Sequence, residues 1–427
     1  MRCARAERRL QMTETFHFST ARELLNRAKV LDMPLPYSEH IPEILGQRLN
    51  ICGTTVSNRL VAQPIEGFDS QADGSPSERS IERYCQLVRG GFRTLWLESI
   101  SVDKQGRSNP FQLWIRPENV GAFRDMVRRI RAQTKENLFL VIQLTHSGRN
   151  SNPNGTPQPV CAFSNPCIPK ENEYILPDEE IPEIEEDYVK ACILAQEAGF
   201  DAVDIRTCHG YLLNEFLAAY HRPGSYGGSY ENRTRFLMEI LDKLESAITI
   251  PMGIRLNMYD GLPWPYGWGA DPQGENLEES YRLVSDLYAR GIRLLNITNG
   301  IGAYSPFVIR PYDRGGKEPT ESPFRGLARM QECAKQTKAL APEAVVIASA
   351  FSWLREFAPG VAAGAIAAGD YDMAGFGRQS IRLPDTANKI LSGQGLLRKE
   401  CCVTCCGCTN LIKKSGKMLR CVIKDKE

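Results

Sequence analysis

The feature that most constrains the fold is a repeated alternation of short apolar runs with amphipathic helical segments. Helical patterns occur, for example, at 118–134, 185–199, 231–247 and 278–291. Eight apolar or β-branched runs, which we interpret as strands, precede or follow them at 59–65, 94–100, 138–145, 202–206, 251–257, 294–299, 345–350 and 372–377. Apolar strands that alternate with amphipathic helices indicate a parallel sheet covered on both faces. Eight such units therefore predict an α/β fold, a (β/α)8 TIM barrel.

The chain divides into three expected parts: an N-terminal extension (1–44), the barrel (45–395) and a cysteine-rich segment (396–427). A doubly wound open sheet is the alternative, but it would show a G-x-G-x-x-G turn after an early strand, and the sequence has none. Residues 20–34 can form one helix outside the barrel or against a partner subunit. The Pro-, Asn-, Ser- and Gly-rich stretch 146–182 is expected to be a long active-site loop after a strand.

Charge and hydrophobicity exclude several classes of protein. The chain has 52 Lys+Arg against 51 Asp+Glu, a balance that gives no electrostatic case for nucleic-acid binding. No apolar run approaches the ~18 residues that a membrane span needs. The basic first dozen residues lack the apolar core of a signal peptide, and Met12 is an alternative start to Met1. We therefore expect a cytoplasmic protein with no nucleic-acid or membrane partner, and a homo-oligomer.

Cysteine is concentrated at the C-terminal end. Of 14 cysteines, six fall between residues 401 and 421, and four of them have the spacing Cys402-x2-Cys405-x2-Cys408-x12-Cys421. Clustered thiols in a large chain indicate a metal site rather than a disulfide framework. Four thiolates suit a 4Fe-4S cluster and equally suit zinc, so the residues alone leave the metal open.

The most informative segment for catalysis is 199–236, GFDAVDIRTCHGYLLNEFLAAYHRPGSYGGSYENRTRF. Arg206 and His209 are polar donors at the end of an expected strand, and Tyr211 follows. Donors that converge there could hold and polarise a carbonyl, and a tyrosine can give a proton. The alternative is that His209 caps a helix and Tyr211 belongs to the core.

This segment closely resembles the old yellow enzyme family of FMN-dependent ene-reductases, also described as NADH:flavin oxidoreductases. The resemblance extends, in the order that the family shows, over about residues 42–395. It includes NRLVAQPIEG (58–67), LVIQLTHSGR (140–149), PMGIRLN (251–257) and AGFGRQ (374–379). It implies a barrel that binds FMN and an enzyme that acts on CH–CH bonds.

The resemblance also implies roles for individual residues. Gln143 would hydrogen-bond the flavin pyrimidine edge, and Arg255 would place a cation near N1 and O2, where it favours the reduced anion. Arg206 and His209 would bind the electron-withdrawing group of the substrate, and Tyr211 would protonate the carbon opposite the hydride. The remaining expected FMN contacts are Pro64, Ile65, Glu66, Ala350, Gly377 and Arg378.

Three residues depart from the family pattern. Arg206 stands where relatives carry His or an aromatic residue, which suggests selection of an anionic activating group; the alternative is a salt bridge to a neighbouring Asp or Glu. Glu66 replaces Thr or Cys, and it either carries a proton or turns away to pair with an Arg. Ala350 lies in VVIASAFS, where many relatives are glycine-rich, and this makes phosphate binding there less secure.

The cysteine spacing is similar to the 4Fe-4S motif that follows the barrel in 2,4-dienoyl-CoA reductase, 2-enoate reductase and trimethylamine dehydrogenase. The resemblance favours iron–sulfur over zinc, with Cys401 and Cys406 as spare thiols beside the ligands. Such relatives continue into FAD- and NAD(P)-binding parts, whereas this sequence ends six residues after Cys421. We expect a separate reductase or ferredoxin-like donor, with NAD(P)H as the direct or indirect source of electrons.

Two weaker candidates remain. The aromatic residues of 256–276 (Tyr259, Trp264, Tyr266 and Trp268) either cover a planar substrate or form a packed surface flap. His146 is expected to hydrogen-bond within its own loop.

These observations predict an ene-reductase that reduces an activated C=C bond of an enone or enoate, with electrons relayed through the cluster. The alternatives are an amine dehydrogenase of the trimethylamine dehydrogenase type and an electron-transfer subunit of a larger complex.

Overall fold

The strands close into a parallel eight-stranded barrel. The structure, a computed structural model, describes residues 14–414 and 417–425; the question of Met1 or Met12 lies outside these residues. The spatial order of the strands follows the chain, and the pairing of Ala374 in the last strand with Leu60 in the first closes the sheet. The barrel strands are β3 (Leu60–Ala62), β4 (Thr94–Ser101), β5 (Phe139–Thr145), β8 (Ala202–Ile205), β9 (Met252–Asn257), β12 (Leu294–Thr298), β13 (Val345–Ala348) and β14 (Met373–Phe376). All eight predicted strands, and the predicted fold, are confirmed.

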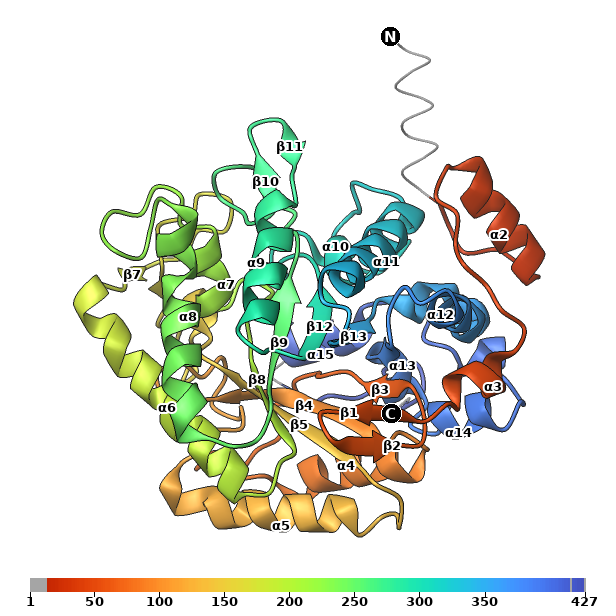
Figure 1. Cartoon of the computed structure of the whole chain (residues 1–427), viewed down its shortest axis with the longest axis horizontal. Coiled ribbons are helices and arrows are strands. Elements are labelled where there is room, and N and C mark those ends of the chain that lie inside the picture. Colours follow the sequence, from red (N-terminus) through yellow and green to blue (C-terminus); the bar gives the residue numbers. More distant parts are fainter. Residues whose placement is uncertain (1–13, 415–416, 426–427) are drawn as a thin grey trace.

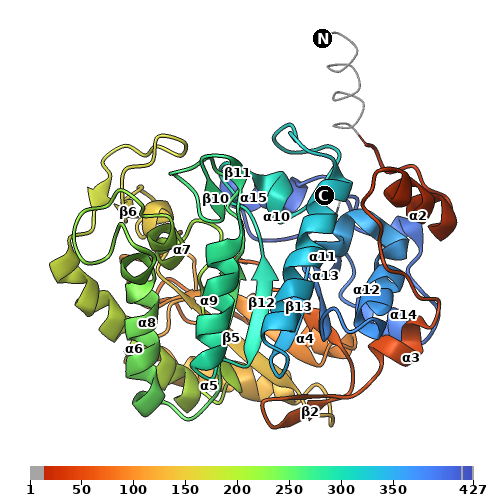
Figure 2. The ribbon, with the colours of Figure 1, turned by 45° about the horizontal axis from the view of Figure 1, so that its top comes forward.

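An outer ring of helices covers the barrel (Figures 1 and 2). Four of them begin at a serine or threonine that caps the first turn: Thr20, Ser77, Ser229 and Ser322 each accept a backbone N–H of the helix that follows. The principal helices are α2 (Ala21–Val30), α4 (Glu78–Arg89), α5 (Val120–Arg131), α6 (Ile181–Glu197), α8 (Tyr230–Ala247), α9 (Glu278–Ala289), α11 (Pro323–Leu340) and α12 (Ala358–Ala367).

Shorter elements fill the connections. The short α-helices are α3 (Ile41–Leu45), α7 (Leu212–Leu217), α10 (Pro306–Ile309), α13 (Arg378–Arg382), α14 (Thr386–Leu391) and α15 (Gly407–Lys414). Two-stranded pairs are β1–β2 (Leu49–Ile51, Thr54–Val56), β6–β7 (Val160–Cys161, Tyr174–Ile175) and β10–β11 (Ala270–Asp271, Gly274–Glu275). The 3₁₀ turns are η1 (Pro117–Asn119), η2 (Gly148–Asn150), η3 (Asp178–Glu180), η4 (Phe351–Phe357) and η5 (Arg398–Glu400).

The hydrophobic core has two layers. The larger layer lies between the strands and the helices, as expected for strands that are buried along their whole length. The smaller layer fills the amino end of the barrel, where Ile51 and Val56 of the β1–β2 hairpin pack on Trp96, Phe139 and their neighbours. The hairpin therefore closes the amino end, and the carboxyl ends of the strands are left to form a site.

The N-terminal segment from residue 14 packs on the outside of the barrel. Phe16 and Phe18 are buried, and the Phe16 ring meets Trp353 edge-on with their centroids 5.5 Å apart. Leu24 and Ala28 form the buried face of α2. Of the two sequence-based expectations for this helix, the structure shows the one outside the barrel.

Among residues 14–414 and 417–425, no helix combines the length and the apolar character that a crossing of the bilayer requires.

Candidate active site

One cavity of about 580 Å³ occupies the carboxyl end of the barrel. The loops after seven barrel strands supply its charged and polar lining, which is the usual position of an active site in a TIM barrel. The cavity contains every predicted catalytic and FMN-contacting residue: Pro64, Ile65, Glu66, Gln143, Arg206, His209, Tyr211, Arg255, Ala350, Gly377 and Arg378. Residues separated by more than 300 positions in the sequence thus meet at one place.

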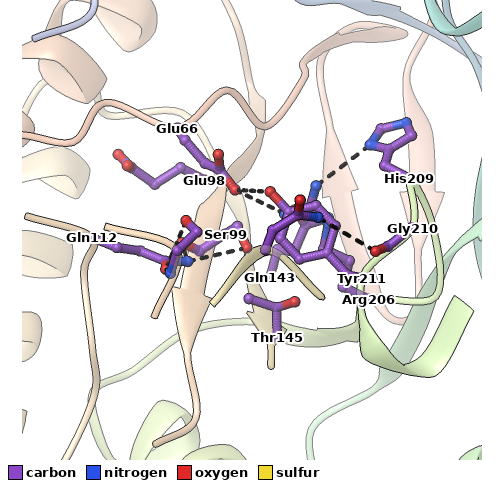
Figure 3. A network of polar contacts seen from close by, with 12 residues as sticks. Glu66, Glu98, Ser99, Gln112, Gln143, Thr145, Arg206, His209, Gly210 and Tyr211 are labelled. Carbon is purple, nitrogen blue, oxygen red and sulfur yellow. Dashed lines mark hydrogen bonds and ion pairs between the residues drawn. The ribbon is translucent and has the colours of Figure 1, made fainter. Parts of the chain in front are cut away.

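The turn after β8 brings the three predicted catalytic side chains together (Figure 3). His209 and Gly210 both have positive φ, 64° and 77°, and this tight left-handed turn sends the chain back over the end of the strand. Arg206 Nη2 lies 3.4 Å from His209 Nδ1, and His209 Nε2 lies 3.0 Å from Thr298 Oγ1 at the end of β12. His209 is therefore held between the ends of β8 and β12, which lie on either side of β9, and it does not cap a helix.

Glu66 joins this turn from the loop after β3. Its Oε1 accepts a hydrogen bond of 2.7 Å from the Tyr211 hydroxyl and one of 3.1 Å from Arg206 Nη1. The Arg206 guanidinium also stacks on the Tyr211 ring, 3.5 Å from the centroid. Arg206 thus forms a salt bridge with a nearby Glu, which was the alternative interpretation of this residue from the sequence. Glu66 pairs with an Arg, as one interpretation expected, but it faces the cavity instead of turning away.

Burial and charge set the protonation of this cluster. Burial works against the charge of Arg206, but Tyr211, Cys208 and Glu66 outweigh it, so the pKa of Arg206 is raised. The pKa of Tyr211 is raised by burial and by Glu66, although Arg206 opposes the shift. The tyrosine therefore keeps its proton until a reaction partner takes it.

Gln143 is oriented by a buried carboxylate. Its Nε2 donates a hydrogen bond of 2.6 Å to Asp204 Oδ2, which also accepts from Trp96 Nε1 at 2.6 Å, while Asp204 Oδ1 accepts the backbone N–H of Arg255 at 2.6 Å. Burial raises the pKa of Asp204 to about 6, although the hydrogen bonds from Gln143 and Trp96 act in the opposite direction. Asp204 links three elements of the proposed flavin site and was missed by the sequence analysis.

Three arginines in the cavity fit an anionic cofactor. Among the described residues, none of Arg255, Arg310 and Arg378 forms an ion pair with a carboxylate, and the side chain of Arg310 contacts the Cys406 thiol. Arg255 Nε, Arg310 Nε and Arg378 Nη1 are buried and lack any hydrogen-bond partner there. Buried donors without partners are costly, so this arrangement suits a phosphate and the electron-rich edge of a flavin. Arg149 also lines the cavity, but Glu173 and Glu215 already neutralise it.

Arg310 was not predicted. It follows α10 in the loop after β12, and burial and the neighbouring Arg378 lower its pKa. Its only sequence signal was its place after a barrel strand, because the family motifs quoted for the resemblance do not include this loop.

Ala350 has a backbone conformation that favours glycine. Its φ and ψ are 74° and 10°, in the left-handed region, and it lines the cavity beside Ser349 and Phe351. Alanine therefore stands here at a position whose backbone suits the glycine of the family pattern.

The aromatic residues of 256–276 do not line this cavity, so their interpretation as a substrate cover was wrong. Trp268 is fully buried in the core, and Trp264 packs on Tyr220 and His221. Arg329 lies over the Tyr259 ring. These contacts occupy three of the four rings, as in a packed flap, whereas Tyr266 lines a separate cavity with His221 and Phe163. His146, as expected, accepts a hydrogen bond within its loop, from Gly148 N at 3.1 Å.

A second, smaller cavity contains the cysteines. Cys402, Cys405, Cys408 and Cys421 line it together with Cys401 and Cys406. Cys401 Sγ donates to Leu397 O at 3.4 Å and Cys406 Sγ donates to Thr404 O at 3.5 Å. No group of three or more potential ligands is gathered closely enough to hold a metal ion within residues 14–414 and 417–425.

The two cavities adjoin. Arg378 and Cys408 line both, and Ile412 and Leu419 of the C-terminal segment line the larger one. Leu419 N also donates to Gly67 O at 3.1 Å, directly beside Glu66. The cysteine segment therefore forms part of the wall of the barrel site.

Comparison with known proteins agrees with this geometry. The family model described as NADH:flavin oxidoreductase / NADH oxidase family matches residues 46–293. The chain belongs to this family, which includes old yellow enzyme. Membership makes it a flavin-dependent oxidoreductase and implies FMN as its cofactor, in agreement with the cavity and its unpaired arginines.

Curated relatives of this NADH:flavin oxidoreductase include an NADH oxidase of Thermoanaerobacter brockii, 28% identical over 400 residues, which cover 90% of this chain and 56% of the relative. An NADPH dehydrogenase of Halalkalibacterium halodurans is 30% identical over 264 residues, 61% of this chain and 74% of the relative. The chain thus spans about half the length of the first relative and most of the second.

Solved structures share the fold. A complex of 2-naphthoyl-CoA reductase has a TM-score of 0.73 at 22% identity, covering 90% of this chain and 57% of that one. Histamine dehydrogenase from Rhizobium sp. 4-9 has a TM-score of 0.68 at 20% identity, and the match covers 90% of this chain and 52% of that one. The old yellow enzyme homologue from Zymomonas mobilis has a TM-score of 0.66 at 22% identity, and the match covers 83% of this chain and 94% of that one. Both reductases and an amine dehydrogenase therefore use this barrel.

Proposed function

We propose that the chain is an ene-reductase that reduces a C=C bond conjugated to a carbonyl or carboxylate group. The observation that carries the proposal is that Arg206, His209 and Tyr211 face the same cavity as the unpaired arginines suited to FMN. Bound FMN would supply a hydride to the β carbon of the substrate. Residues Pro64, Ile65, Gln143, Arg255, Arg310, Ala350, Gly377 and Arg378 would hold it.

The protein side of the reaction needs an acid and an anchor for the oxygen of the activating group. Arg206 and His209 would bind that oxygen and stabilise its developing negative charge. The Tyr211 hydroxyl, which keeps its proton because of burial and Glu66, would give it to the α carbon. Arg206 Nε is buried without a hydrogen-bond partner and supports a polar ligand here.

We also propose that Cys402, Cys405, Cys408 and Cys421 bind a 4Fe-4S cluster. All four thiols line one small cavity, and the other two thiols there already donate to backbone carbonyls. Thr404 and Cys406 have positive φ, 53° and 57°, a backbone shape that turns N–H groups toward an anionic group. The cluster would accept electrons from a separate reductase or ferredoxin-like donor, and NAD(P)H would be their source.

The amine dehydrogenase remains a second candidate because of one observation. The charge of Arg206, which would repel a cationic amine, is neutralised by Glu66 in the structure. The remaining lining favours the ene-reductase, since Arg255, Arg310 and Arg378 leave the cavity with unpaired positive charge.

Anaerobic purification followed by a visible spectrum and an iron and sulfide assay tests the two cofactors. In a stopped-flow instrument, photoreduced protein is then mixed with cinnamate or a cyclic enone, and oxidised protein is mixed with trimethylamine. The proposal expects yellow flavin bands, iron with acid-labile sulfide, and reoxidation by an alkene. Bleaching of oxidised protein by the amine, with no reoxidation by any alkene, would instead establish the amine dehydrogenase. Bound zinc in place of iron, with no acid-labile sulfide, would refute the proposed 4Fe-4S cluster.

A further inference from the structure

Glu66 is the only carboxylate that lines the 580 Å³ cavity among the described residues, and it contacts the proposed proton donor directly. The Tyr211 hydroxyl donates to Glu66 Oε1 at 2.7 Å, a distance short enough for proton exchange between the two oxygens. Tyr211 itself is 9% exposed and faces the cavity. After Tyr211 gives up a proton, Glu66, which accepts the hydrogen bond of its hydroxyl, is the group placed to replace it.

A fixed negative charge on Glu66 would hinder catalysis. A carboxylate at 2.7 Å makes the tyrosine a weaker acid, and Glu66 contributes to the raised pKa of Tyr211. It would also oppose the gain of negative charge when a flavin in the cavity is reduced. Both conflicts disappear if Glu66 is protonated in the reduced protein, because Tyr211 can then donate while it receives the proton of Glu66.

We propose that Glu66 is the proton reservoir of the active site: it takes up a proton when the cofactor is reduced and passes it through Tyr211 to the substrate. The inference rests on the proposed ene-reductase function for its last step. In that step the Glu66 O–H and Tyr211 O–H bonds break, and new Tyr211 O–H and Cα–H bonds form. The hydride comes from reduced FMN, and the electron donor replaces the two electrons used per alkene.

The charged groups around Glu66 suit a reversible acid. From the turn after β8, Arg206 contacts the same Oε1 and stabilises the carboxylate after the proton has left, with His209 3.4 Å beyond it. On the opposite side, the Gly67 N–H donates to Glu98 Oε2 at 2.7 Å, and Arg83 and Tyr84 hold Glu98. These contacts fix the loop that carries Glu66, so its carboxyl stays against Tyr211 (Figure 3).

Gly67 is packed closely on both sides. A Cβ at this position would meet the Arg83 guanidinium, and Leu419 N of the cysteine segment donates to Gly67 O. Glu66 is therefore positioned by the barrel on one side and by the C-terminal segment on the other.

A count of protons tests the uptake step without any alkene. Wild-type protein and the Glu66→Gln variant, both loaded with FMN, are photoreduced in weak buffer with a pH indicator dye. We expect wild type to take up close to one proton more per flavin than Glu66→Gln, while Tyr211→Phe takes up as many as wild type. Equal counts in wild type and Glu66→Gln would overturn the proposal. Any cluster contributes equally to these matched proteins.

The rate of reoxidation by an enone tests the transfer step, because the relay predicts that Glu66→Gln is slower than wild type and the alternative predicts that it is faster. The relay predicts that Glu66→Gln is slower by about 10²-fold, the usual contribution of general acid catalysis. It also predicts that the double variant Glu66→Gln/Tyr211→Phe is no slower than Tyr211→Phe alone, because the two groups act in series. If Glu66 only suppresses the acidity of Tyr211, Glu66→Gln will be reoxidised faster than wild type. A rate for Glu66→Gln equal to or above that of wild type would refute the relay. Additive losses of rate in the double variant would refute it as well.

Two further controls keep the result interpretable. Glu66→Asp retains a carboxyl, so it should recover the proton count even if its shorter reach slows transfer. If Glu66→Gln fails to bind FMN, Glu66→Ala, which also lacks the carboxyl, takes its place in the proton count. If no alkene reoxidises wild type, the proposed function has failed, whereas the proton count still decides whether Glu66 is a reservoir.

Discussion

At the scale of single residues, the pairing of Arg206 with Glu66 decides how the site treats charge. The two side chains are 140 positions apart and meet only because the loops after β3 and β8 project from the same end of the barrel. The sequence marked each as unusual but could not show that one neutralises the other. The hypothesis that Arg206 selects anionic substrates is therefore weakened by its own partner.

Replacement of Arg206 tests this directly. Because Arg206 would bind the oxygen of the activating group in both substrates, Arg206→Ala is expected to slow reduction of a neutral enone and of its carboxylate analogue by the same factor, about 10²-fold. Stopped-flow reoxidation with the two substrates measures both losses. A loss confined to the carboxylate would show that Arg206 recognises a substrate charge after all.

Arg310 offers a second residue-scale prediction. Its buried Nε lacks a partner in the described structure, and a hydrogen bond to a charged group is worth about 1.5–3 kcal/mol. Arg310→Ala should therefore weaken FMN binding by roughly 10- to 100-fold, measured by titration of flavin-free protein. Arg314→Ala is the matched control, because this side chain is 67% exposed and lies outside the cavity lining. Equal affinities for the two variants would remove Arg310 from the site.

At the scale of elements, the strands were predictable and the long connections were not. Each barrel strand is an apolar run with a clear boundary, and all eight were recognised within a few residues. For the aromatic flap after β9, the sequence could not decide between the two interpretations, since tryptophans such as Trp264 and Trp268 are equally suited to cover a substrate. Only their packing against Tyr220, His221 and the core shows otherwise.

The cysteine segment gives the element-scale prediction. Cys401 and Cys406 donate to backbone carbonyls, and the four proposed ligands have no such bond among the described residues. Cys408→Ser should lose most of the iron and sulfide, whereas Cys401→Ser should keep it. Iron content per chain after anaerobic purification measures the difference. Equal losses of iron in both variants would show that the wrong cysteines have been assigned as ligands.

At the scale of the whole molecule, the family, barrel and cavity could be inferred because several motifs occur in a fixed order along the chain. The charge network could not be inferred, since Arg310 lies outside the quoted motifs and nothing in the segments that hold Asp204 and Glu98 shows which groups these carboxylates meet. Their importance comes from burial, which only the closed barrel provides.

Buried carboxyls also give the molecule a pH dependence. Burial raises the pKa of Asp204 and Asp260 to about 6, and that of Glu98 and Glu185 to about 7. A carboxyl with a higher pKa in the folded than in the unfolded chain binds protons preferentially when folded, so acidification stabilises the fold. Buried His146, whose pKa is lowered, opposes this with a smaller effect.

We therefore expect the free energy of unfolding of the flavin-free protein to rise by about 2 kcal/mol between pH 8 and pH 6. Urea denaturation at several pH values measures it. A steady fall over the same interval would mean that these carboxyls stay ionised in the folded state.

The central claim is that the turn carrying Arg206, His209 and Tyr211 performs the chemistry of the cavity. Photoreduced wild-type protein and Tyr211→Phe, each with FMN bound, are mixed anaerobically with the best enone, and the return of flavin absorbance is followed. We predict that Tyr211→Phe binds and accepts electrons as wild type does but is reoxidised about 10²-fold more slowly. Equal reoxidation rates would contradict the account, because the proton would then come from elsewhere.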